Sequence, residues 1–285
     1  MKKTCATLIL LMSSFVAVFS QDALTRGPDN GSLLLIGGHA NDSLFLPLFQ
    51  RLAGGENASV VVIPTARSRE SVQQDGFVQR QKERFNEYGF EDVTILHTRS
   101  REEANSDAFV GHVHRADGVW FMGGRQWRLN DSYLDTKTHE ALNSLLERGG
   151  VIAGSSAGAT IQGSYLVRGD TQTNTVMMGD HEKGLAFISN VAVDQHLLAR
   201  NRHFDMFEVL RKKTELLGIG LDENTGVVVE NDTCRVVGES YVAIYDGTRW
   251  SAERDTIYQL TDDQEQFYFL HQGQGYDLKN RRVVR

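Results

Sequence analysis

A run of small residues at positions 154–158, Gly-Ser-Ser-Ala-Gly, carries the strongest chemical signal in this sequence. It follows an apolar stretch at 150–153 and precedes a helix-like segment, which is the context of a G-x-S-x-G nucleophile elbow. Such a bend exposes the hydroxyl of Ser156, and the next helix N-terminus offers free N–H groups to an oxyanion. We expect Ser156 to be a nucleophile and the Ala157 N–H to be one oxyanion donor. A small-residue turn can also merely pack a helix on a strand, but the strand–turn–helix context favours the nucleophile.

A serine nucleophile needs a base and a group that orients the base. An apolar segment ends in Asp194-Gln195-His196, which places three polar side chains at the carboxyl edge of the predicted sheet. His196 is the best candidate base, although the chain has nine histidines and any one can be an ordinary surface residue. The orienting acid is Glu223 or its neighbour Asp222. Spacing leaves this choice open, because adjacent side chains of a strand point to opposite faces.

Strand-like and helix-like segments alternate through the first half of the chain. Strands that are apolar throughout and separated by helices predict a parallel sheet covered on both faces. With right-handed crossovers, the fold class is α/β with a doubly wound, mostly parallel sheet. Ligand sites of such sheets lie at the carboxyl ends of the strands. The predicted strands are 32–36, 59–63, 93–96, 118–121 and 151–153, the predicted helices are 44–52, 70–88, 102–110 and 132–148, and the strand ends of interest are 37–39, 64–67, 122–126 and 154–158.

The second half is richer in strand-like segments. They lie near 191–193, 219–221, 226–230 and 242–245, and one helix is expected at 198–210. The last stretch, 255–285, is typical of a polar β appendage. Because no repeat, low-complexity segment or proline-rich linker marks a boundary, we interpret 32–285 as a single α/β domain preceded by a polar lead at 21–31.

The N-terminus has the features of a signal peptide at residues 1–20. Lys2 and Lys3 precede an apolar run at 7–19 that is too short to span a bilayer comfortably. Val18 and Ser20 suit the positions before a cleavage site, so we expect cleavage before Gln21 and a secreted or periplasmic protein.

Composition narrows the list of partners. The 285 residues carry a formal net charge of −7 and no Lys/Arg-rich run, so we expect no nucleic-acid partner and no membrane association after signal cleavage. Of the two cysteines, Cys5 leaves with the signal peptide and Cys234 cannot form an intrachain disulfide. No Cys/His spacing predicts a metal site. A homodimer is one state that the sequence allows.

Four motifs occur in order. They are Met-Gly-Gly-Arg-Gln at 122–126, Gly-Ser-Ser-Ala-Gly-Ala at 154–159, Asp-Gln-His at 194–196 followed by Arg200 and Arg202, and Gly-Leu-Asp-Glu-Asn-Thr at 220–225. Together they resemble the cyanophycinases, relatives of aspartyl dipeptidase (peptidase E), over residues 32–245. The resemblance implies a class I glutamine-amidotransferase-like, flavodoxin-like fold and serine peptidase chemistry without a cofactor. It also implies hydrolysis of cyanophycin, a polyaspartate with arginine on each β-carboxylate, to β-aspartyl-arginine.

The resemblance also assigns roles. Ser156 is implied to be the nucleophile, His196 the base and Glu223 its partner, and Gly124 the second oxyanion donor beside Ala157. The implied substrate-pocket residues are Gln126, Asp194, Gln195, Arg200 and Arg202. Arg125, Arg200 and Arg202 can bind carboxylates in bidentate fashion, and Asp194 can meet a substrate arginine. The chain departs from the family where a third arginine is usual, because Asp205 stands there, which weakens the expectation for the substrate more than for the chemistry.

A glutamine amidotransferase is disfavoured because that chemistry uses a cysteine at the elbow. Three alternatives stay open. The same scaffold can serve another peptide substrate, it can be a non-catalytic binding module, or the protein can be an esterase. An ordinary esterase of the α/β-hydrolase class has its histidine last in the chain, and only His271 is available there.

Overall fold

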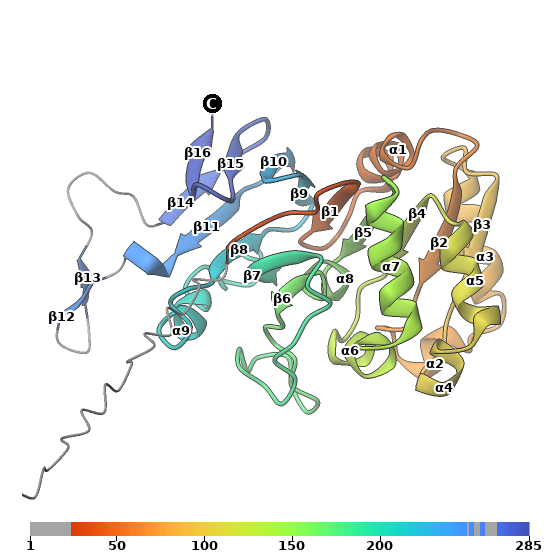
Figure 1. The fold of residues 1–285 in the computed structure, drawn as a ribbon, viewed down its shortest axis with the longest axis horizontal. Helices are drawn as coiled ribbons and strands as arrows, with labels where there is room; N and C mark the ends of the chain where they lie inside the picture. The colour runs from red at the N-terminus through yellow and green to blue at the C-terminus, as the bar shows by residue number, and fades with distance from the viewer. Residues whose placement is uncertain (1–23, 250, 254–256, 260–266, 285) are drawn as a thin grey trace, which may run out of the picture.

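The computed structural model describes residues 24–249, 251–253, 257–259 and 267–284 (Figure 1). The expected signal peptide lies outside the described residues. Within them, no helix is both long enough and apolar enough to span a membrane.

A nine-stranded sheet forms the centre of the molecule, in the order β16-β15-β10-β9-β1-β5-β4-β2-β3. Its strands β1, β5, β4, β2 and β3 are parallel, and β9, β10, β15 and β16 extend it by antiparallel pairing. The bounds are β1 (Ser32–Ile36), β2 (Ser59–Ile63), β3 (Asp92–Ile95), β4 (Gly118–Phe121), β5 (Val151–Ser155), β9 (Thr225–Glu230), β10 (Thr233–Gly238), β15 (Gly275–Asp277) and β16 (Arg282–Val284).

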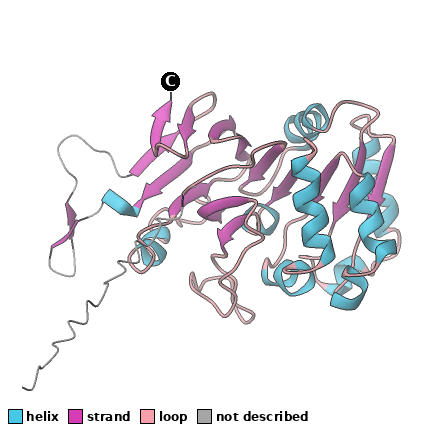
Figure 2. Cartoon of the chain, viewed as in Figure 1, coloured by secondary structure: helices cyan, strands magenta, loops and turns pink. Residues whose placement is uncertain are grey.

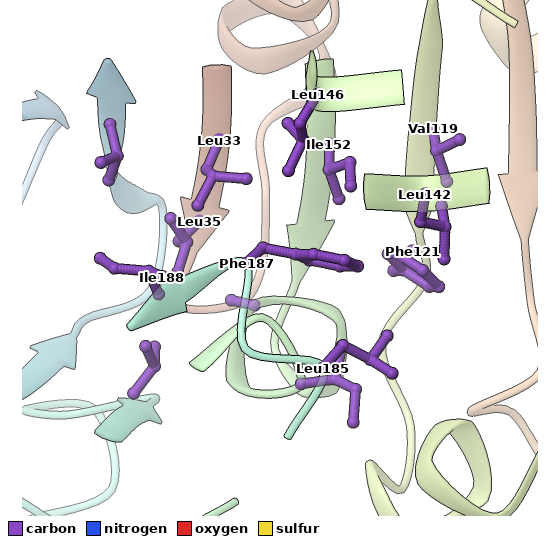
Figure 3. Packing of buried hydrophobic residues seen from close by; sticks show 14 of the residues in the cluster. Leu33, Leu35, Val119, Phe121, Leu142, Leu146, Ile152, Leu185, Phe187 and Ile188 are labelled. Carbon is purple, nitrogen blue, oxygen red and sulfur yellow. The ribbon is translucent and has the colours of Figure 1, made fainter. Parts of the chain in front are cut away.

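Side chains of the parallel strands alternate between two cores, as the two-residue period of a strand requires. In β1, Leu33 and Leu35 join a core with α5 (Asp107–Arg115) and α7 (Lys137–Glu147), whereas Leu34 and Ile36 join a core with α1 (Asp42–Leu52) and α3 (Phe77–Asn86). Figure 3 shows Leu33, Leu35 and Ile152 of the sheet beside the α7 side chains in the first core. Helices therefore cover both faces of the parallel strands, and the predicted α/β class is confirmed (Figure 2).

The helices differ from the predicted ones mainly by interruptions. The segment predicted at 70–88 breaks at Gly76, whose φ is +71°, and the one predicted at 132–148 breaks at Asp135, whose φ is +55°. The helix predicted at 198–210 is wrong except for its last turn. The bounds are α1 (Asp42–Leu52), α2 (Arg69–Val72), α3 (Phe77–Asn86), α4 (Arg101–Ala104), α5 (Asp107–Arg115), α6 (Trp127–Tyr133), α7 (Lys137–Glu147), α8 (Ala157–Thr160) and α9 (Met206–Leu210).

A second sheet, in the order β14-β11-β8-β7-β6, packs beside the first. Strands β7 and β8 run parallel, so their carboxyl ends lie together. The bounds are β6 (Gly163–Tyr165), β7 (Ile188–Gln195), β8 (Leu217–Leu221), β11 (Val242–Asp246) and β14 (Phe267–Leu270), with a separate pair β12 (Ser251–Glu253) and β13 (Ile257–Gln259) after a 3-10 turn at Gly247–Arg249.

The two ends of the described chain are built into the sheets. The segment predicted to be a β appendage at 255–285 does contain β-strands, and it supplies β14 to the second sheet and β15 and β16 to the first. Part of the polar lead also pairs, because Arg26 and Ser189 exchange backbone hydrogen bonds. Cys234 is fully buried, and burial raises the pKa of its thiol to about 12, so it is a packing residue rather than a reactive one.

Candidate active site

Ser156 stands on a strained turn between β5 and α8. Its φ is +57° and its ψ is −115°, a region that residues with a side chain rarely adopt. The flanking glycines make the turn possible, because a Cβ on Gly154 would lie 2.2 Å from the carbonyl oxygen of Gly158. The Ser156 N–H donates to the carbonyl of Ile36 at 2.8 Å, which fixes the elbow to the end of β1. The turn has the geometry predicted from the motif.

A hydrogen-bonded chain connects Ser156, His196 and Glu223. The Oγ of Ser156 lies 2.9 Å from Nε2 of His196, and Nδ1 of His196 lies 2.7 Å from Oε1 of Glu223. A carboxylate accepts at Nδ1, so Nδ1 carries the proton and Nε2 is left to accept the serine O–H. The three residues follow the carboxyl ends of β5 in the first sheet and of the neighbouring strands β7 and β8 in the second. They are in hydrogen-bonding contact in the order serine, histidine, acid.

The neighbouring acid, Asp222, faces away from His196. Its Oδ1 accepts hydrogen bonds from the N–H groups of Leu198 and Ala199, at 2.9 and 3.0 Å, and its Oδ2 accepts from Ser240. Asp222 therefore holds the turn that follows His196. The spacing in the sequence left open whether Asp222 or Glu223 orients the histidine. In the structure this acid is Glu223, because of the two carboxylates only that of Glu223 contacts the His196 ring.

His196 is 7 % exposed, and its surroundings lower the pKa of its imidazole, which favours the neutral form. Burial is the main cause that lowers its pKa, and the positive charges of Arg200 and Arg202 lower it further. The hydrogen bond and charge of Glu223 act in the opposite direction. A neutral imidazole can accept a proton, which is the state that a base requires.

The loop after β1 contributes contacts that sequence reasoning did not assign. Gly37 accepts a hydrogen bond from the His196 N–H at 3.1 Å, and a Cβ on Gly38 would lie 2.2 Å from Cε1 of His196. His39 places its Nε2 3.7 Å from Oε1 of Glu223. The available signal was the Gly-Gly pair at a strand end, which marked the segment but not its role.

The backbone N–H groups of Ala157 and Gly124, the two expected oxyanion donors, make no hydrogen bond to any described residue. Ala157 begins α8, so its N–H has no acceptor within the helix. Gly124 belongs to the loop after β4, and a Cβ on its neighbour Gly123 would lie 3.3 Å from Cβ of Ser156. Both N–H groups therefore lack an acceptor among the described residues.

The expectation that Asp194 meets a substrate arginine is corrected by the structure. The carboxylate of Asp194 is 1 % exposed, and both oxygens accept from Arg168, Nε at 2.8 Å and Nη2 at 2.9 Å. Arg168 also donates to Asp205, at 2.5 Å. Asp194 therefore does not face a substrate cation, because an arginine of the chain already occupies it. Sequence reasoning missed Arg168, and no motif surrounds it.

Most of the other residues expected to line the substrate pocket make hydrogen bonds within the chain, and one of them does not. Gln126 donates to the Val167 carbonyl at 2.8 Å and is 1 % exposed. Arg202 donates to the backbone and side-chain oxygens of Gln195, and Arg125 donates to the carbonyls of residues 170 and 173. These side chains hold the walls of the site. Arg200 is exposed, and its guanidinium makes no hydrogen bond or ion pair with the described residues.

The described residues contain no group of three or more His, Cys, Asp or Glu side chains that could hold a metal ion. The side chains brought together at the site are a hydroxyl, an imidazole and a carboxylate. Such a set is typical of acyl transfer.

The fold and this site define a serine-type peptidase, and the comparisons agree. Residues 33–237 match the family model for peptidase family S51, and the chain belongs to that family.

Among curated proteins, the chain is 33% identical over 266 residues to a cyanophycinase from a Nostoc species, covering 89% of this chain and 87% of the relative. It is 32% identical over 228 residues to a cyanophycinase from Geminocystis herdmanii, covering 77% of this chain and 82% of the relative. The predicted resemblance is thereby confirmed.

Solved structures share the fold. A peptidase from an acI-B1 actinobacterium aligns with a TM-score of 0.62 at 22% identity, covering 90% of this chain and 98% of that one. A putative peptidase E from Listeria monocytogenes aligns with a TM-score of 0.53 at 18% identity, covering 74% of this chain and 99% of that one.

Proposed function

We propose that the protein hydrolyses amide bonds of aspartate-rich peptides through an acyl-enzyme on Ser156. The observation that carries this proposal is the contact between Ser156 Oγ and His196 Nε2 at 2.9 Å, backed by Glu223. A serine is a weak nucleophile unless a base takes its proton, and His196 is neutral and in contact. Proton transfer of this kind contributes about 10²–10⁴-fold to rate.

The first half of the reaction forms the acyl-enzyme. The Oγ of Ser156 bonds to the substrate carbonyl carbon while its proton moves to Nε2 of His196. The carbonyl oxygen becomes an oxyanion, which the N–H groups of Ala157 and Gly124 stabilise. Glu223 remains ionised and stabilises the imidazolium. When the C–N bond breaks, His196 returns the proton to the leaving amine.

The second half restores the enzyme. A water molecule loses a proton to His196 and bonds to the acyl carbon. The bond from this carbon to Oγ then breaks, and Oγ takes the proton from Nε2. The products are a carboxylic acid and the free serine, so every proton is accounted for by one histidine.

For the substrate, we propose cyanophycin or a related aspartyl peptide, because the curated relatives are named cyanophycinases. One observation favours a related peptide rather than cyanophycin itself. Asp194, the acid that the sequence led us to expect beside a substrate arginine, is buried and bound by Arg168. Because both oxygens of Asp194 already accept hydrogen bonds from Arg168, this carboxylate would add little to the binding of a substrate arginine.

Purified protein should be incubated with insoluble cyanophycin and, separately, with β-aspartyl dipeptides, and the released products identified by mass spectrometry. We expect one of these substrates to be cleaved by the native protein and neither by the Ser156→Ala variant. Cleavage by Ser156→Ala at the native rate would reject the proposed mechanism. Cleavage of dipeptides without cyanophycin would select the second substrate class.

We also propose that the protein is exported with cleavage before Gln21, which rests on the charge and apolar pattern of residues 1–20. Expression with residues 1–20 in a secreting host, followed by N-terminal sequencing of the exported protein, tests this. A first residue other than Gln21, or retention in the cell, would contradict it.

A further inference from the structure

A pocket of about 350 Å³ lies beside the elbow. Its wall includes His39 after β1, Arg67 after β2, Gly123 after β4 and Ser155 at the end of β5. These are the carboxyl ends of the parallel strands, where ligands of such sheets bind. Because Ser155 and Gly123 also border Ser156, a molecule that reacts at the serine hydroxyl can extend into this pocket.

The pocket contains one neutralised and one unpaired guanidinium. Arg84 is bound by Asp42, with Nε donating to Oδ2 at 2.7 Å and Nη2 donating to Oδ1. The guanidinium of Arg67, in contrast, makes no hydrogen bond or ion pair with any described residue. Arg67 is exposed overall, but its guanidinium lines the pocket, where partial desolvation is the main cause that lowers its pKa and the charge of Arg84 adds to it. Arginine nevertheless stays protonated in proteins, so the pocket holds an uncompensated positive charge.

Further arginines gather around the same loop. Arg99 donates to the carbonyl of Arg67 at 2.6 Å, and Arg128 donates to the carbonyl of Ala66 at 3.0 Å. Burial lowers the pKa of Arg128 most, followed by the charges of Arg99 and Arg125, while Glu70 opposes them. A cationic cluster on a chain with a formal net charge of −7 creates a local field that attracts anions.

Gln81 supplies the second unused group. It lines the same pocket, and its side-chain oxygen is buried with no hydrogen-bond partner among the described residues. Buried polar atoms are usually paired, and one that is not indicates a missing partner. The pocket can therefore bind an anionic group of a ligand through the Arg67 guanidinium. It can also bind an N–H or O–H group of the ligand through the side-chain oxygen of Gln81.

We propose that this pocket is a subsite for a carboxylate of the substrate, bound by Arg67, with Gln81 accepting from an N–H group next to that carboxylate. An aspartyl unit carries both groups. The proposal rests on the proposed function, because it requires a substrate that reacts at Ser156. The carboxylate can belong to the acyl part or to the leaving amine, and the experiment below distinguishes the two.

The first test compares two phosphonofluoridates that differ only in one arm, a carboxylate or its methyl ester. We expect the native protein to react faster with the carboxylate form. In Arg67→Ala the ratio of the two labelling rates should fall by about tenfold to a hundredfold, the usual range for a lost hydrogen bond to a charged group. Arg69→Ala is the matched control, because Arg69 is exposed like Arg67 but does not line the pocket. An unchanged ratio in Arg67→Ala overturns the proposal.

Two pairs of peptides locate the carboxylate. One pair places aspartate or asparagine on the acyl side of the scissile bond, and the other places them on the leaving side. Loss of aspartate preference in Arg67→Ala for the first pair assigns the pocket to the acyl part. Loss for the second pair assigns it to the leaving residue.

A third measurement separates this proposal from the proposed function. Succinate binding to Ser156→Ala, followed by NMR, needs no reaction. Binding that weakens about tenfold or more when Arg67→Ala is added supports the subsite even if no probe labels Ser156. Equal succinate binding with and without Arg67, or none in either, contradicts the subsite whatever Ser156 does.

Discussion

Gly38 leaves no room for a side chain against the ring of His196. A Cβ at position 38 would lie 2.2 Å from Cε1 and 2.5 Å from Nδ1 of that histidine, and the φ of Gly38 is +142°. The glycine therefore allows the ring to lie between Ser156 and Glu223.

Gly38→Ala should lower kcat/KM by about 10²-fold, because displacement of a reacting group by about 1 Å has a cost of this size. Gly54→Ala is the control, since Gly54 also has a positive φ, +104°, but its Cβ would meet nothing within 4 Å. Both variants should lose similar stability from the backbone, whereas only the first should lose activity. Equal activities would show that the ring tolerates the contact.

Glu223→Gln and Asp222→Asn should have different effects. Glu223→Gln removes the carboxylate that holds Nδ1–H, so kcat should fall by about 10²–10⁴-fold with little change in the free energy of unfolding. Asp222→Asn removes an acceptor from the turn after His196 and should lower stability by about 1–3 kcal/mol. Steady-state kinetics and urea denaturation measured on both variants check this. A larger loss of kcat in Asp222→Asn would reverse the assignment.

The pH dependence follows from the lowered pKa of His196. The base must be neutral, and burial keeps it neutral to a pH below its ordinary value, so the acid limb of kcat/KM should lie below about 6.5. Arg200→Gln removes a positive charge that lowers this pKa, so the limb should move to higher pH. The pH profile of each protein measures the shift. A limb that stays in place, or moves to lower pH, would contradict this electrostatic account.

Arg168 and Asp194 should contribute strongly to stability as a pair. Arg168→Gln leaves a buried carboxylate with only Gln195 N–H as a donor, and breaking a buried pair in this way costs about 3–5 kcal/mol. Lys137→Ala is the control, since its ion pair with Asp107 is exposed and should contribute about 0–1 kcal/mol. Urea denaturation gives both values. Equal effects would mean that the buried pair is dispensable.

Strand positions were predictable from the sequence because buried strands are apolar throughout. The runs at 32–36, 59–63 and 118–121 match β1, β2 and β4 residue for residue. Helix ends were less predictable, because a single positive φ, as at Asp135, breaks a helix that periodicity continues. The β character of the C-terminal segment was predicted, but the strands with which it pairs were not. Its strands pair with β10 and β11, and pairing over such distances leaves no local pattern.

For the site, position at a strand end predicted more than residue type did. His196 and Glu223 follow neighbouring strands of the second sheet, whereas Ser156 follows β5 of the first, and the contact between Ser156 and His196 joins the two sheets. The partner of Asp194 was not predictable, since Arg168 lies 26 residues away in a segment without a motif. The proposed role of Arg67 was not predictable either. It depends on Arg84, and not Arg67, being bound by Asp42, and the sequence contains no pattern for this pairing.

The most direct test of the central claim is covalent labelling with a phosphonofluoridate, mapped by peptide mass spectrometry. The account predicts one adduct, on Ser156, in the native protein and a labelling rate reduced by several powers of ten in His196→Ala. No adduct on Ser156 in an active preparation, or full peptidase activity in Ser156→Ala, would contradict it.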